Sequence, residues 1–143
     1  MNSSDVYIET AQLTKVFRDF WLRERVTAVA ELDMQVYAGE VFGLLGPNGA
    51  GKSTTLKLIL GLLFPSRGKV AVFGKRPTDV RSKRRIGFLP EESYLYPFLT
   101  ARETLDYYGR LFKLPRRERQ LRVDMLLEMV GLEAVAYRPV GEY

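Results

Sequence analysis

The spacing of hydrophobic and polar residues changes along the chain, from alternation in the first half to a helical period in the second. Residues 6–13 alternate and predict an edge strand, and residues 28–36 and 69–74 predict two more strands. The short apolar run at 40–45 is typical of a buried parallel strand, and 86–89 predicts another strand that Pro90 terminates. We therefore expect an antiparallel sheet beside a parallel core.

Three segments carry the spacing of helices. Leu56, Ile59, Leu60 and Leu63 recur at helical intervals until Pro65. A second helix follows the capping box of Thr100 and Glu103, presents an apolar face and ends before Pro115; the face consists of Ala101, Leu105, Tyr108 and Phe112. A third helix spans about 116–130 and stops at Gly131. The last two helices are close enough in sequence to form a hairpin.

Composition limits the chemistry that this chain supplies. The 143 residues are 46% hydrophobic and include neither cysteine nor histidine. Disulfides, cysteine metal sites and histidine base chemistry are therefore excluded for these residues. The longest apolar run, 58–64, is too short for a membrane span, and no secretory signal is visible.

The formal charge of +5 suits a phosphate ligand, an anionic lipid or a nucleic acid. The basic residues cluster at 83–85 and 116–119, without the aromatic ladder that stacks bases. We therefore interpret these clusters as solvated surface and expect no nucleic-acid partner.

The most specific motif is Gly46-Pro47-Asn48-Gly49-Ala50-Gly51-Lys52-Ser53-Thr54, which fits the phosphate-binding loop pattern. Glycines let the main chain approach phosphate oxygens. Lys52 is expected at the β- and γ-phosphates, and the Ser53 hydroxyl is expected on Mg²⁺. The predicted phosphate-binding residues are Asn48, Gly49, Ala50, Gly51, Lys52, Ser53 and Thr54. The plain alternative, a glycine-rich turn that happens to carry a lysine, does not explain the strand and helix predicted on either side.

Residues 16–21 are unusually aromatic for a loop. These rings either pack against the sheet or stack on a nucleotide base. The sequence leaves both possibilities open.

Taken in order, these motifs resemble the ATP-binding subunit of an ABC transporter. The resemblance rests on 46–54 as the Walker A loop, on the turn and strand 65–70, and on 86–91 leading into 96–105, which is similar to the family's Q-loop and the start of its helical subdomain. It implies an α/β fold: a P-loop NTPase core with an antiparallel β-subdomain and the start of a helical subdomain, incomplete. Residues 1–92 would form the β-subdomain and Walker A core, and 93–143 part of the helical subdomain.

The resemblance also implies roles for residues outside the loop. Phe17 matches the ring that stacks on adenine, with Phe20 and Trp21 as rivals. Glu91 stands where the family usually has glutamine, so it is expected to act beside Lys52 in catalysis and to join Ser53 on Mg²⁺.

The function implied is ATP-driven transport across a membrane, with an exporter-like helical segment. ATP and Mg²⁺ would be the cofactors. The partners would be transmembrane permease subunits and a second nucleotide-binding subunit, at the cytoplasmic face of the membrane. The signature motif, Walker B strand and switch histidine do not occur in these 143 residues, so this chain is expected to bind nucleotide and hydrolyse it negligibly. A non-transport P-loop kinase and a stand-alone nucleotide-binding module are the alternatives.

Overall fold

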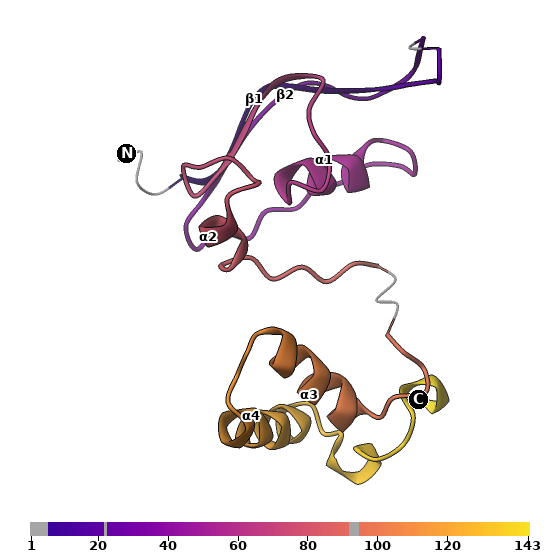
Figure 1. Ribbon diagram of the computed structural model, residues 1–143. Coiled ribbons are helices and arrows are strands. Elements are labelled where there is room, and N and C mark those ends of the chain that lie inside the picture. Colours follow the sequence, from indigo (N-terminus) through magenta and orange to yellow (C-terminus); the bar gives the residue numbers. More distant parts are fainter. Residues whose placement is uncertain (1–5, 22, 92–94) are drawn as a thin grey trace. The chain divides into compact units, whose positions relative to one another are not determined.

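The computed structural model describes residues 6–21, 23–91 and 95–143, which divide into two compact units (Figure 1). The first unit extends to Gly87 and the second begins at Phe88. Each unit has a hydrophobic core of its own. Leu13, Val29 and Leu58 form the first core, and Val123, Leu127 and Ala136 form the second.

The sheet of the first unit has three antiparallel strands in the order β2-β1-β3. They are β1 (Val6–Arg18), β2 (Glu24–Tyr37) and β3 (Arg67–Val72). The predicted antiparallel sheet is confirmed, but the prediction of an edge strand at 6–13 is wrong, because β1 is central. Alternation reports which face of a strand is covered, and it carries no information about which edges are paired. The strand also continues to Arg18, so Val16–Arg18 is not a loop.

Helix α1 (Lys52–Ile59) packs on this sheet through Leu58, which is fully buried against Leu13 and Val29. The helix ends earlier than Pro65, where the sequence placed its end. Gly61 takes a left-handed φ of 64°, and its N–H bonds to the Leu58 carbonyl. This glycine therefore stops the helix. A short helix, α2 (Val80–Lys83), follows β3.

The apolar runs 40–45 and 86–89 are not strands in the structure. Val41 is 100% exposed and Leu89 is 86% exposed. A strand requires a neighbouring strand to bond, and within the described residues neither run lies in a ladder. The two runs are apolar as the sequence shows, but an apolar run without a partner strand does not form a strand.

The second unit is built on the helical hairpin α3 (Ala101–Leu111) and α4 (Arg116–Met129), with 3₁₀ turns at Glu133–Val135 and Val140–Glu142. The predicted capping box is confirmed: Thr100 Oγ1 accepts from the Glu103 N–H, and the Glu103 carboxylate accepts from the Thr100 N–H. The predicted α3 face is covered only in part. Ala101 and Leu105 pack on the core, whereas Tyr108 and Phe112 are exposed.

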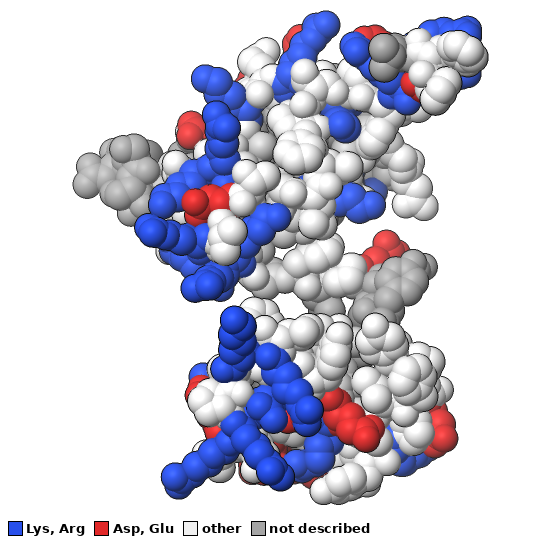
Figure 2. All heavy atoms as spheres, in the orientation of Figure 1, with Lys and Arg blue, Asp and Glu red and all other residues white. Residues whose placement is uncertain are grey.

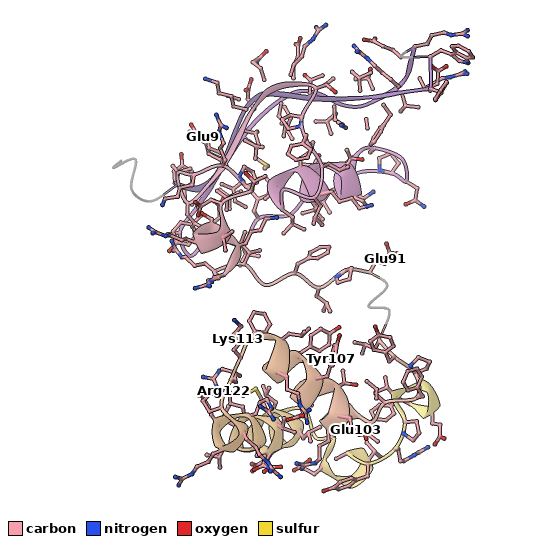
Figure 3. All side chains as sticks on the ribbon, in the orientation of Figure 1. Glu9, Glu91, Glu103, Tyr107, Lys113 and Arg122 are labelled. Atoms are coloured by element: carbon pink, nitrogen blue, oxygen red, sulfur yellow. The ribbon has the colours of Figure 1, made fainter. Side chains whose placement is uncertain are left out.

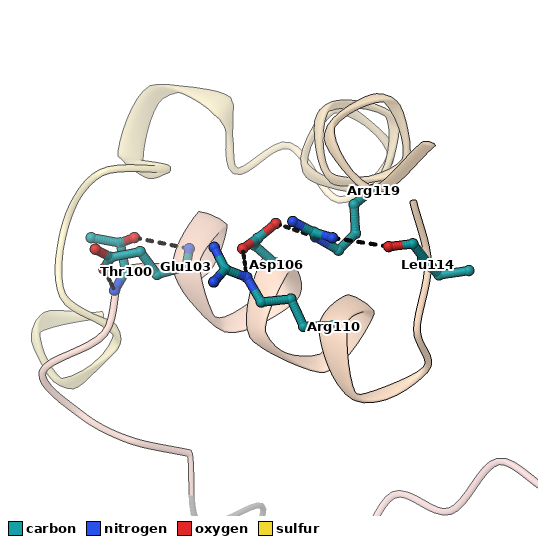
Figure 4. A network of polar contacts seen from close by, with 6 residues as sticks. All are labelled: Thr100, Glu103, Asp106, Arg110, Leu114 and Arg119. Carbon is teal, nitrogen blue, oxygen red and sulfur yellow. Dashed lines mark hydrogen bonds and ion pairs between the residues drawn. The ribbon is translucent and has the colours of Figure 1, made fainter. Parts of the chain in front are cut away.

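An ion-pair network joins the two helices of this hairpin (Figure 4). The Asp106 carboxylate accepts from Arg119 of α4 at 2.5 Å and from Arg110 of α3 at 2.7 Å. Arg119 also donates to the Leu114 carbonyl between the helices. The network confirms that the two helices pack as a hairpin.

Candidate nucleotide-binding site

The phosphate loop leads into the N-terminal end of α1, inside the first unit (Figure 1). Gly51 is the N-cap of the helix and has a φ of 86°. A Cβ atom added there would lie 2.0 Å from the Ala28 carbonyl oxygen of β2. Only glycine satisfies both conditions, so the close approach of Gly51 to the sheet fixes where the loop begins its helix.

Backbone N–H groups gather at this point. The amides of Lys52, Ser53 and Thr54 open the helix and have no intrahelical acceptor, and no other described residue accepts from them. The first turn contains no acidic residue. Free N–H groups and the positive end of the helix dipole therefore form a cradle for an anion.

Lys52 adds a cation to this cradle. Its ammonium group donates to the Gly46 carbonyl at 2.6 Å and to the Pro47 carbonyl at 2.7 Å, so the side chain folds back over the loop. Both acceptors are neutral, and a phosphate would offer a charged acceptor in the same region. The residues present thus fit a nucleotide phosphate group.

Thr55 supports the helix start through hydrogen bonds that the loop motif does not specify. It is buried, and both its N–H and its Oγ1 donate to the Gly51 carbonyl, at 2.8 and 3.0 Å. Ser53, one position inside the helix, is exposed and available to a metal. The signal for Thr55 was present, since a threonine interrupts the apolar pattern of the helix. Ala28 acts through its carbonyl group, which no side-chain pattern reveals.

The candidate base-stacking rings differ in setting. Phe17 lies in β1 opposite Val26, is 39% exposed, and has the Lys15 ammonium 5.3 Å from its ring centre. Phe20 and Trp21 lie in the β1–β2 turn, 91% and 71% exposed, and contact each other edge to face. None of the three is buried against the sheet.

The two predicted metal ligands lie in different units of the structure. Ser53 belongs to the first unit and Glu91 to the second, where Glu91 lies exposed on a stretch without helix or strand (Figure 3). Among the residues with described positions, no cluster of three acidic side chains could hold a metal ion. A joint role for Ser53 and Glu91 stays a prediction.

These features define a P-loop nucleotide-binding protein: a loop that ends at Gly51, free backbone amides at the start of α1, and the Lys52 ammonium group. The sequence model of the family described as ABC transporter matches residues 29–143, and the chain therefore belongs to the ABC transporter family. The predicted family is confirmed.

Relatives and solved structures agree with this assignment. An uncharacterized ABC transporter ATP-binding protein of Synechocystis is 46% identical over 126 residues, which are 87% of this chain and 36% of the relative. The Nod factor export ATP-binding protein I of Bradyrhizobium is 39% identical over 137 residues, 95% of this chain and 43% of that protein. The chain spans less than half of the length of these relatives.

The fold agrees as well. The structure of an ATP binding subunit of an ABC transporter matches with a TM-score of 0.74 at 29% identity, over 96% of this chain and 55% of that one. Part of the cbiONQ ABC transporter complex, cbiO1 of Clostridium perfringens, matches with a TM-score of 0.75 at 25% identity, over 94% of this chain and 54% of that one. The α/β class is thereby confirmed. Within residues 6–21, 23–91 and 95–143, the helices lack the length and hydrophobicity of a membrane span.

Proposed function

We propose that this chain binds ATP with Mg²⁺ through residues 48–54, as the nucleotide-binding part of an ABC transporter subunit. The protein that contains it would couple ATP binding and hydrolysis to movement of a substrate across a membrane. Its partners would be transmembrane permease subunits and a second nucleotide-binding subunit, at the cytoplasmic face of the membrane.

The observation that carries the proposal is the arrangement of donors at the start of α1. The Lys52 ammonium and the helix-opening amides converge on one loop, and the neighbouring Gly51 leaves no room for a side chain. Such donors stabilise the negative charge of a triphosphate and orient its terminal phosphoryl group.

Each of these groups has a separate task. The backbone amides would hold the phosphate oxygens, and Lys52 would exchange its two carbonyl contacts for the β- and γ-phosphates. The Ser53 hydroxyl would take one position on Mg²⁺, which when bound spreads the charge of the phosphates, and Glu91 would supply a further oxygen. We identify no water-activating group in these residues, so we propose nucleotide binding with negligible hydrolysis by this chain alone.

The two alternatives explain less. A P-loop kinase shares the loop, but the family match extends over residues 29–143 and so covers far more than the loop. A module that binds nucleotide without transport would share every contact described above, and the relatives named as export proteins favour transport.

Lys52→Ala tests the proposal by calorimetric titration with Mg-ATP. Loss of the charged contact should weaken binding at least about tenfold, because charge-assisted hydrogen bonds contribute roughly 1.5–3 kcal/mol. The matched control is Lys57→Ala, which removes the same charge from an exposed position later in α1. Equal affinities of wild type and Lys52→Ala would contradict the role of Lys52.

A further inference from the structure

A basic segment remains that the nucleotide site does not use. It comprises six exposed side chains around α2, all in the first unit: Lys75, Arg76, Arg81, Lys83, Arg84 and Arg85. Figure 2 shows lysine and arginine atoms gathered over this part of the unit. Asp79 is the one acidic residue between positions 75 and 85.

Among the residues that the structure describes, the cations of this basic segment form no ion pairs. In the part of the chain that the structure describes, no carboxylate lies within 4.0 Å of any of the six cations. The Asp79 carboxylate instead accepts from the Ser82 N–H and hydroxyl. The other basic cluster differs, because Arg119 there pairs with Asp106, and Glu118 pairs with Arg122.

The segment is also folded into one surface. The Arg85 guanidinium stacks over the Phe73 ring, 3.9 Å from its centre, and Tyr7 packs edge to face on the same ring. This contact joins Arg85, at the end of the segment, to the turn at its beginning. In that turn the Val72 N–H donates to the Lys75 carbonyl, and the Lys75 N–H donates to the Val72 carbonyl. Arg85, at the end of the segment, is therefore fixed to the turn at its beginning.

We propose that this basic segment binds the anionic lipid surface of a membrane. Clustered cations next to a bilayer are attracted by acidic headgroups. Val80 lies in the middle of the cluster and is 66% exposed, which suits an interface with an apolar layer beneath its charges. A nucleic acid fits less well, because Arg85 already covers the Phe73 ring that could stack on a base.

Co-sedimentation of the 143-residue chain with vesicles tests this inference. We expect binding to phosphatidylcholine vesicles in which a third of the lipid is phosphatidylglycerol, and little binding to phosphatidylcholine alone. Because electrostatic attraction is screened by salt, raising the ionic strength to about 0.5 M should release the chain.

The variant Lys83→Gln/Arg84→Gln should weaken vesicle binding roughly 30-fold, from about 1 kcal/mol per cation. Arg85 is kept because it packs on Phe73. The matched control is Arg116→Gln/Arg117→Gln, which removes two exposed charges from the second unit and should change binding less than about twofold. Unchanged nucleotide affinity and circular dichroism of the Lys83/Arg84 variant would show that it folds.

Three results would overturn the inference: equal binding to neutral vesicles, equal loss in both double variants, or displacement by millimolar inorganic phosphate. Tighter binding to an oligonucleotide than to the vesicles at the same salt would assign the surface to nucleic acid instead. The proposed function is tested separately, since Lys52→Ala should lose nucleotide and still bind anionic vesicles.

Discussion

At the scale of single residues, Gly51 sets the distance between the phosphate loop and the sheet. Its φ of 86° and its approach to the Ala28 carbonyl oxygen are independent obstacles to any side chain. Gly49 in the same loop has a φ of 83° but open space where its Cβ would be. A side chain at Gly49 would meet only backbone strain, whereas a side chain at Gly51 would meet backbone strain and a steric clash with β2.

Replacing each of these glycines with alanine gives a direct comparison. Gly49→Ala should cost roughly 1–2 kcal/mol of unfolding free energy, from the left-handed backbone alone. Gly51→Ala should cost more than about 3 kcal/mol, because the methyl group also displaces β2 or the loop. Urea denaturation of both variants measures the difference. Equal costs would mean that Gly51 does not touch the sheet as described.

Phe17 is the ring that we propose for adenine, since strand pairing with Val26 holds its position. Phe17→Ala should weaken the binding of Mg-ATP roughly tenfold, because a stacking contact of about 1–3 kcal/mol is lost. The affinity for tripolyphosphate, which has no base, should not change. Trp21→Ala is the control, because Trp21 lies in the exposed turn. If Trp21→Ala selectively weakens ATP instead, the assignment of the ring is wrong.

At the scale of elements, the α3–α4 hairpin depends on a carboxylate shared by two arginines. The side-chain hydrogen bond from Arg119 lowers the pKa of Asp106, and the backbone hydrogen bond from Thr100 lowers the pKa of Glu103. A lowered pKa means that the ionised form stabilises the folded state. This contribution is complete above the ordinary carboxyl range, about pH 4, and is lost as the pH falls through the lower folded-state values.

The second unit should therefore lose stability on acidification below about pH 4. Asp106→Asn should lower its urea midpoint at pH 7 and flatten this acid dependence, because the variant has no proton to gain at that position. Glu128→Gln serves as the control, since Glu128 is exposed in α4 and has no ion pair with a described residue. Far-UV circular dichroism follows the helices. An unchanged pH profile in Asp106→Asn would contradict the role of the shared carboxylate.

The features that the sequence predicted correctly are those encoded by residues a few positions apart. The capping box at Thr100 depends on a residue three positions away and is observed. Helix α3 ends at Leu111, before Pro115. The α1 helix ended earlier than predicted because Gly61 adopts a left-handed conformation and its N–H bonds to the Leu58 carbonyl, although the apolar spacing continues to Leu63.

At the scale of the whole molecule, the sequence predicted the transition from the loop to α1 better than it predicted the sheet. The phosphate-loop pattern is a short continuous stretch, so Gly51 and Lys52 could be named as candidates without a structure, and their role in phosphate binding stays a prediction. The order of strands depends on pairings between distant segments, so β1 was wrongly placed at an edge, and 40–45 was wrongly predicted to be a strand. The relation of Ser53 to Glu91 spans two units and stays a prediction.

An amide chemical-shift titration of the 143-residue chain with Mg-ATP shows directly whether the phosphate loop holds the nucleotide. We expect the largest shifts on the backbone amides of residues 48–54, and we expect Lys52→Ala to need at least about tenfold more Mg-ATP to produce them. Binding of Mg-ATP that leaves these amides unperturbed, or shifts concentrated elsewhere in the chain, would contradict the claim that this loop holds the nucleotide.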